Sequence, residues 1–120
     1  MNKNTKKVTI YHNPRCSKSR QTLALIESQG IQPEVVLYLD YPPSTEKLQQ
    51  ILNLLGMSAK QLIRNGESLY KTLNLDDEHL SEADLINAMC THPILIERPV
   101  VEHKNRACIG RPPELVLELL

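Results

Sequence analysis

Apolar residues are arranged in two ways along the first third of the chain. The runs Val8–Tyr11 and Pro33–Leu39 are short and rich in β-branched and apolar residues, which is typical of buried strands. Between them lies a helical repeat that should end near Gly30, a residue able to adopt the left-handed conformation after a helix. Two strands joined by one helix predict a parallel βαβ unit.

The middle of the chain shows helical patterns only. Ser44 is a candidate N-cap for a helix that Gly56 stops, and Ser58 with Gln61 three residues later is a capping-box pattern. Two further helices are expected, one over Glu67–Leu75 and one that begins at Ser81 and ends before Pro93. We therefore expect a helical insertion over about residues 56–92.

The segment from Val100 onward returns to a strand pattern. Val100–Glu102 and Ala107–Ile109 flank a polar tip at His103–Arg106, which predicts a β-hairpin, and Arg111–Glu114 should start a final helix. A chain of 120 residues suggests one domain over residues 1–120. The fold class predicted is α/β, a mixed β-sheet flanked by helices.

Composition excludes several classes of function. Lysine and arginine together number 14, as do aspartate and glutamate, so the chain has no excess positive charge for binding nucleic acid. Trp and Phe are absent, so aromatic stacking on nucleic-acid bases is not expected either. No apolar run approaches the ~18 residues that span a membrane, and the polar start is not a secretory signal. Three widely spaced cysteines favour free thiols over disulfides or a metal site. We expect a cytoplasmic protein that binds neither metal, nucleic acid nor membrane.

Cys16 is the candidate nucleophile because it lies where the first strand turns into the first helix. Unpaired N–H groups and the helix dipole favour a thiolate there. Lowering a thiol pKa by about two units takes ~2.7 kcal/mol, whereas a helix N-terminus supplies ~0.3–1 kcal/mol. Neighbouring hydroxyl and cationic groups must supply the rest, and the candidates are His12, Ser17, Lys18, Ser19 and Arg20. The alternative reading is a buried, inert cysteine.

The order of elements, with an X-Pro pair before the hairpin, resembles a thioredoxin-like fold. Four motifs, taken in order, resemble the glutaredoxin-linked arsenate reductase (ArsC) family, in a compact, YfgD-like branch: residues 12–20, 37–39, 92–99 and 110–114. The resemblance covers about residues 7–120. It implies a cis bond between Arg98 and Pro99.

The resemblance also implies an activity and a site. It implies that arsenate forms a Cys–S–As adduct, that glutathione is the co-substrate and that glutaredoxin resolves the mixed disulfide, in a monomer with no bound cofactor. Cys16 would attack arsenate, His12 would help its ionisation and Ser19 would place a hydroxyl near the sulfur. The oxyanion would be held by Arg64, Arg98 and Arg111.

Other readings stay open. His12 could be a hydrogen-bonded structural histidine, and Arg64 could be a solvated helix residue. Cys90 and Cys108 read as packing residues. Rival functions are a glutathione-linked thiol oxidoreductase with another substrate, and a redox-regulatory binding protein of the same superfamily, although Ser19 stands where a Cys-x-x-Cys switch needs its second thiol. A phosphatase-type arsenate reductase requires a Cys-x5-Arg motif. Residues 16–20 form Cys-x3-Arg instead, so this class is set aside.

Overall fold

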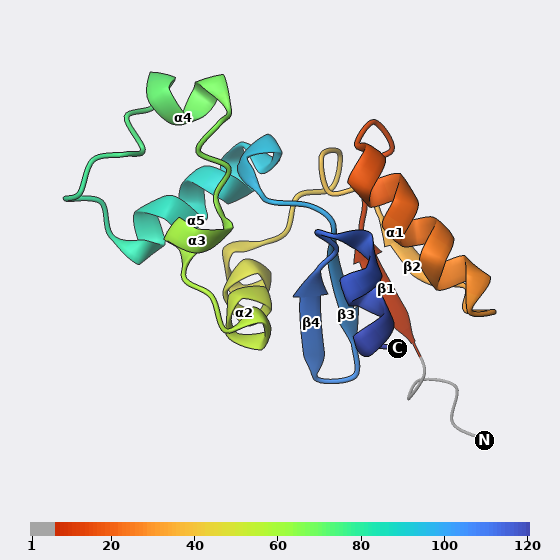
Figure 1. Cartoon of the computed structure of the whole chain (residues 1–120). Helices are drawn as coiled ribbons and strands as arrows, with labels where there is room; N and C mark the ends of the chain where they lie inside the picture. The colour runs from red at the N-terminus through yellow and green to blue at the C-terminus, as the bar shows by residue number, and fades with distance from the viewer. Residues whose placement is uncertain (1–6) are drawn as a thin grey trace. The chain divides into compact units, whose positions relative to one another are not determined.

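The computed structural model describes residues 7–120, and these divide into two compact units. The first unit consists of the chain up to residue 41 together with residues 98–120, and the second consists of residues 42–97 (Figure 1). The first unit therefore joins the two ends of the chain. The predicted insertion over about residues 56–92 lies inside the second unit, together with the helix before it; one domain over residues 1–120 stays a prediction.

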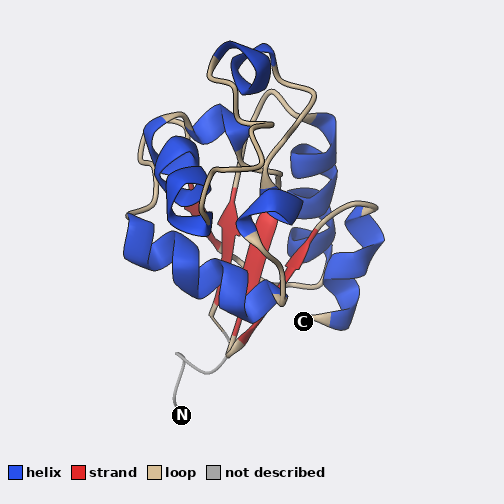
Figure 2. Cartoon of the chain, turned by 90° about the vertical axis from the view of Figure 1, so that its left-hand side faces the viewer, coloured by secondary structure: helices blue, strands red, loops and turns tan. Residues whose placement is uncertain are grey.

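The first unit contains one four-stranded mixed sheet in the order β2-β1-β3-β4. Figure 2 shows the strands of this sheet in red. β1 pairs in parallel with β2 and antiparallel with β3, and β3 pairs antiparallel with β4. The predicted βαβ unit and hairpin are both confirmed. The strands are β1 (Val8–Tyr11), β2 (Glu34–Val36), β3 (Val100–His103) and β4 (Arg106–Ile109).

Two helical elements cover one face of this sheet. The α-helix α1 (Ser17–Ser28) and the 3-10 helix η3 (Pro113–Glu118) lie side by side against it (Figure 1). Each fully buried aliphatic side chain between these layers stabilises the fold by about 1.5–3 kcal/mol. The buried cluster is formed by Val8, Ile10, Ile26, Val101, Val116 and Leu119.

Three details of the first unit differ from the sequence predictions. The second strand ends at Val36 rather than Leu39, because the Leu37 carbonyl accepts hydrogen bonds from the N–H groups of Asp40 (3.0 Å) and Tyr41 (2.9 Å) and the chain turns. The hairpin turn is only Lys104–Asn105, with a positive φ of 58° at Lys104. The last helix is a 3-10 helix that begins at Pro113, two residues after Arg111.

The second unit is helical, as predicted. The N-cap at Ser44, the capping box at Ser58 and the helix start at Ser81 are confirmed, and Gly56 ends its helix with a φ of 67°. Ser81 also forms a capping box, with Asp84, which was not predicted. The helix after Ser58 stops at Leu62, because Ile63 adopts an extended conformation and bridges to Ile96. The elements are α2 (Thr45–Leu55), α3 (Ala59–Leu62), α4 (Ser68–Thr72), α5 (Glu82–Thr91) and η2 (Pro93–Leu95). Among the residues described, no helix is long and apolar enough to cross a membrane.

Candidate active site

Cys16 occupies the N-cap position of α1, at the end of the turn that follows β1. Its N–H donates to the Asn13 carbonyl (3.0 Å), and its own carbonyl accepts the Arg20 N–H (3.0 Å) that begins the helix. Burial raises the pKa of the Cys16 thiol. The Ser19 N–H, the Arg98 side chain and the Lys18 N–H together outweigh that effect and lower the pKa below its ordinary value. The helix start thus acts on the sulfur as the sequence predicts.

Two arginines from the other end of the chain complete this environment. Arg111 Nη2 donates to Cys16 Sγ at 3.4 Å, and Arg111 Nε donates to the Arg98 carbonyl at 2.7 Å. Arg98 acts on the Cys16 thiol through both a hydrogen bond and its charge. The fold therefore brings the predicted nucleophile, Cys16, together with two of the three predicted oxyanion-binding arginines. The cis Arg98–Pro99 bond is confirmed, and Arg111–Pro112, for which none was predicted, is also cis.

A close approach between α1 and the residue before Arg111 fixes this arrangement. Thr22 Oγ1 donates to the Lys18 carbonyl at 2.8 Å and lies 3.4 Å from the Gly110 carbonyl. A Cβ at residue 110 would collide with Thr22 Oγ1 and lie 3.1 Å from Cγ of Pro99. Only glycine allows the helix and this segment to come so close. Sequence reasoning missed both Thr22 and Gly110; the one signal was the glycine directly before Arg111.

His12 and Ser19 bond to each other rather than to the sulfur. His12 Nδ1 lies 2.7 Å from Ser19 Oγ, and the Asn13 N–H donates to the same oxygen at 3.0 Å. Burial and the charge of Arg20 lower the pKa of His12, so its ring is neutral at pH 7. Within residues 7–120 neither side chain hydrogen-bonds to Cys16 Sγ. Their contact joins the end of β1 to the first turn of α1, and their catalytic roles stay predictions.

A cavity of about 280 Å³ lies beside the turn that precedes Cys16. Its walls are residues 12–15 and, from the turn after β2, Leu37, Leu39 and Asp40. All of these residues belong to the first unit. The cavity therefore adjoins the turn that leads to Cys16.

Arg64 belongs to the second unit and is held by two carboxylates there. Its Nε donates to Glu67 Oε2 at 3.0 Å and its Nη1 donates to Glu97 Oε1 at 2.6 Å. Burial lowers the pKa of Arg64, but the hydrogen bonds and charges of both glutamates raise it overall. The residue follows α3 rather than lying in a helix. Its predicted contact with substrate stays a prediction.

The other two cysteines have the opposite character to Cys16. Burial raises the pKa of Cys90 and of Cys108. Cys108 packs against the buried cluster of the first unit, as predicted, and Cys90 is half-buried on α5. No group of three or more metal-ligating side chains occurs among the described residues.

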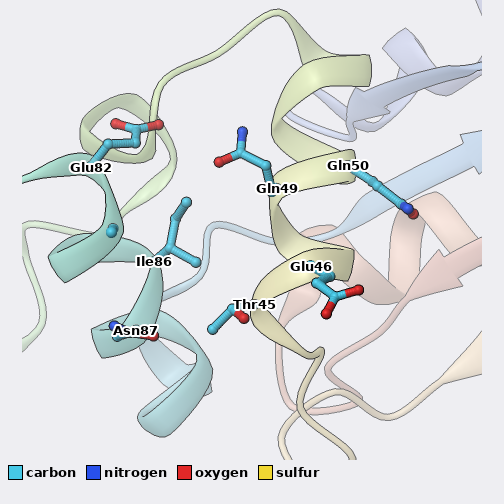
Figure 3. Close-up of a pocket in the computed structure, with 8 residues that line it drawn as sticks. Thr45, Glu46, Gln49, Gln50, Glu82, Ile86 and Asn87 are labelled. Carbon is cyan, nitrogen blue, oxygen red and sulfur yellow. The ribbon is translucent and has the colours of Figure 1, made fainter.

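A wider hollow of about 700 Å³ lies in the second unit. It lies between α2 and α5, and Figure 3 shows Gln49 and Ile86 pointing into it. Its carboxylates come from Glu46 and Glu82, and Glu82 already accepts the Ala59 N–H at 2.9 Å. Its lining includes neither a cysteine nor a cation, unlike the surroundings of Cys16.

Comparison with known proteins places the chain in a family. The ArsC family matches residues 11–119. The chain is 56% identical to the uncharacterized protein YfgD of Escherichia coli over 117 residues, covering 97% of this chain and 98% of YfgD. It is 54% identical to an arsenate reductase of Haemophilus influenzae over 114 residues, covering 94% of this chain and 98% of that protein.

A solved structure confirms the fold class. The arsenate reductase from Vibrio cholerae superposes with a TM-score of 0.94 at 52% identity, covering 98% of this chain and 100% of that one. The predicted α/β, thioredoxin-like mixed sheet flanked by helices is therefore confirmed. The family match spans the Cys16 turn, both arginines beside the sulfur and the helices between them. The chain belongs to the ArsC family.

Proposed function

We propose that this chain is an arsenate reductase that uses Cys16 as nucleophile, glutathione as co-substrate and glutaredoxin as the protein that regenerates it. The observation that carries the proposal is the Cys16 sulfur at a helix start, with Arg111 Nη2 at 3.4 Å and the Arg98 side chain acting on the same thiol. A thiolate and two guanidinium groups are what attack on a tetrahedral oxyanion requires. The Haemophilus influenzae relative, whose name is arsenate reductase, supports the choice of oxyanion.

The first step forms a covalent adduct without changing the valence of arsenic. The Cys16 thiolate attacks arsenic, a sulfur–arsenic bond forms, and one arsenic–oxygen bond breaks as that oxygen takes up protons and leaves as water. The guanidinium groups of Arg98 and Arg111 hold the remaining charged oxygens. Arginine suits this task because its planar fork donates two parallel hydrogen bonds and keeps its charge.

The second step transfers the electrons. A glutathione thiolate attacks Cys16 Sγ, a disulfide bond forms, and the electron pair of the sulfur–arsenic bond passes to arsenic. Arsenic becomes trivalent and leaves, with a proton, as arsenite. Glutaredoxin then takes the glutathione moiety in thiol–disulfide exchange and releases the Cys16 thiol. Two thiols are oxidised to one disulfide for each arsenate reduced.

The test is consumption of NADPH in a coupled assay with arsenate, glutathione, glutathione reductase and glutaredoxin. Turnover should require all of these components, and omission of arsenate or of glutaredoxin should return the rate to background. Wild-type protein with no rate above background in the complete mixture would refute the arsenate assignment. Exchange activity towards glutathione disulfides without arsenate turnover would instead favour a thiol oxidoreductase with another substrate.

A further inference from the structure

The cavity of about 280 Å³ beside the cysteine turn takes no part in the oxyanion chemistry derived above. The arginines at the sulfur come from residues 98–111, whereas the cavity is lined by residues 12–15 and by the turn after β2. Its volume lies just below the range for small-molecule pockets, about 300–1,000 Å³. It is suited to a small ligand that stays partly in solvent.

His12 lines the cavity, and its nearly buried ring can donate a hydrogen bond. His12 is 6% exposed, and its Nδ1 lies 2.7 Å from the Ser19 hydroxyl, which already accepts the Asn13 N–H. With a neutral ring, the arrangement that gives the Ser19 proton an acceptor has Ser19 Oγ donating to Nδ1. In that tautomer the ring proton is on Nε2 of His12, a residue that lines the cavity. Nε2–H has no acceptor within residues 7–120, and a ligand oxygen would supply one.

The rim of the cavity carries both charge signs around an apolar wall. Arg15 and Asp40 are exposed, and Leu37 and Leu39 remain 36% and 37% exposed. Arsenate is a poor match, because the charge of the one lining arginine is offset by a carboxylate. A zwitterion with carboxylates, an ammonium group and a short apolar stem matches all three features.

We propose that this cavity binds glutathione, the thiol co-substrate, so that its sulfur reaches Cys16; the proposal rests on the function proposed above. A carboxylate of glutathione would meet Arg15 and the Nε2–H of His12, and its ammonium group would meet Asp40. The bound thiolate then attacks Cys16 Sγ, a sulfur–sulfur bond forms, and the bond from sulfur to arsenic breaks with its electron pair on arsenic. The cavity is close to Cys16, because Asn13, which lines the cavity, accepts a hydrogen bond from the Cys16 N–H through its carbonyl.

Thiol–disulfide exchange tests the cavity without arsenate. The Cys16 thiolate attacks oxidised glutathione, a mixed disulfide forms and one glutathione thiolate leaves. The rate at Cys16 is measured by mass spectrometry, and bis(2-hydroxyethyl) disulfide serves as a reference that lacks carboxylates and ammonium groups. The ratio of the two rates reports recognition of glutathione, because a change in thiolate reactivity alters both rates alike.

Two variants alter the cavity and two matched variants alter surfaces elsewhere in the first unit. Arg15→Glu inverts a rim charge and Leu39→Trp fills the apolar wall. Arg106→Glu makes the same charge change at the opposite end of the sheet, where Arg106 on β4 pairs with His103 on β3 and His103 pairs with Val8 at the start of β1. Leu117→Trp enlarges a side chain that is 41% exposed on η3.

Arg15→Glu and Leu39→Trp should each lower the glutathione ratio about three- to tenfold, and the matched variants should leave it unchanged. The proposal is overturned if wild type shows no preference for glutathione disulfide, or if the cavity variants change both rates equally. A wild-type preference that these variants abolish, found together with no arsenate turnover, would support the cavity and refute only the proposed substrate.

Discussion

Cys16 and Cys108 belong to the same unit and are both half-buried, yet the pKa of the Cys16 thiol is lowered and that of the Cys108 thiol is raised. Cys108 lies on β4 opposite Val101 and packs against apolar side chains, so burial raises its pKa. Cys16 also loses water, but backbone N–H groups and Arg98 lower its pKa overall. Exposure alone therefore does not decide which thiol is reactive. The decisive difference is whether donors and cations surround the sulfur.

The largest expected effect is the loss of chemistry at one thiol and not at the other. Cys16→Ser should abolish arsenate-dependent NADPH consumption, because a serine hydroxyl stays protonated at neutral pH and cannot form the disulfide. Cys108→Ala should keep most of the activity. The coupled assay on both variants decides this, and a variant set in which Cys108→Ala is inactive while Cys16→Ser turns over would assign the nucleophile to Cys108.

Removing one cation from the reactive thiol should have the next largest effect. Arg98→Ala should lower kcat about 10²- to 10³-fold, the range seen when a preorganised donor to a developing anion is removed. Arg98→Lys should recover only part of this, since an ammonium group keeps the charge and lacks the planar fork. Arg106→Ala on β4 is the matched control. Equal kcat for Arg98→Ala and wild type in the coupled assay would contradict the prediction.

The pH dependence of alkylation should separate the two thiols directly. Alkylation requires the thiolate, so the rate rises as pH passes through the pKa of each group. Cys16 should reach half of its limiting rate at a lower pH than an ordinary thiol, and Cys108 at a higher pH than an ordinary thiol. Arg111→Ala should move the Cys16 midpoint upward by removing the donor 3.4 Å from Sγ.

The measurement is iodoacetamide labelling with mass mapping of each site. Labelling rates of Cys16 and Cys108 that depend on pH in the same way would contradict the predicted difference between their pKa values.

The lowered pKa of Cys16 also has an effect on folding stability. It stabilises the fold above the unfolded-state pKa, and this contribution is lost as pH falls through the folded-state pKa.

The smallest expected effect concerns the scaffold behind Cys16. Ser19→Ala removes the hydroxyl that joins His12 to the Asn13 N–H, and both partners are buried, so the unfolding free energy should fall by about 1–3 kcal/mol. Ser28→Ala makes the same change at an exposed position of α1 and should cost less. Urea unfolding of both variants measures the difference. An equal decrease in unfolding free energy for Ser19→Ala and Ser28→Ala would show that the His12–Ser19 contact stabilises the fold no more than an exposed hydrogen bond does.

Much of the fold follows from local patterns in the sequence. Ser44, Ser58 and Ser81 were sufficient to place three helix starts, because a side-chain oxygen that pairs N–H groups of the first helical turn is a local event. The end of β2 was misplaced because Leu37 and Leu39 suit a strand as well as the exposed turn that they form. Apolar identity cannot distinguish these two settings.

The site was less predictable than the elements. Cys16 could be chosen from its polar neighbours, and the family motifs indicated Arg98 and Arg111. The Nη2 contact to Sγ, the Thr22–Gly110 approach and the two carboxylates on Arg64 are all long-range or tertiary contacts. Local patterns carry no information about them, since each depends on how distant segments pack.

The contact between Arg111 and Cys16 joins residues that are 95 positions apart, and this has a consequence for biosynthesis. A ribosome makes Cys16 first and adds Arg111 only after a further 95 residues. β1, a central strand, likewise gains its β3 neighbour only after the whole helical second unit has been made. A nascent chain that has not yet reached Arg98 and Arg111 therefore carries the Cys16 thiol without either guanidinium group.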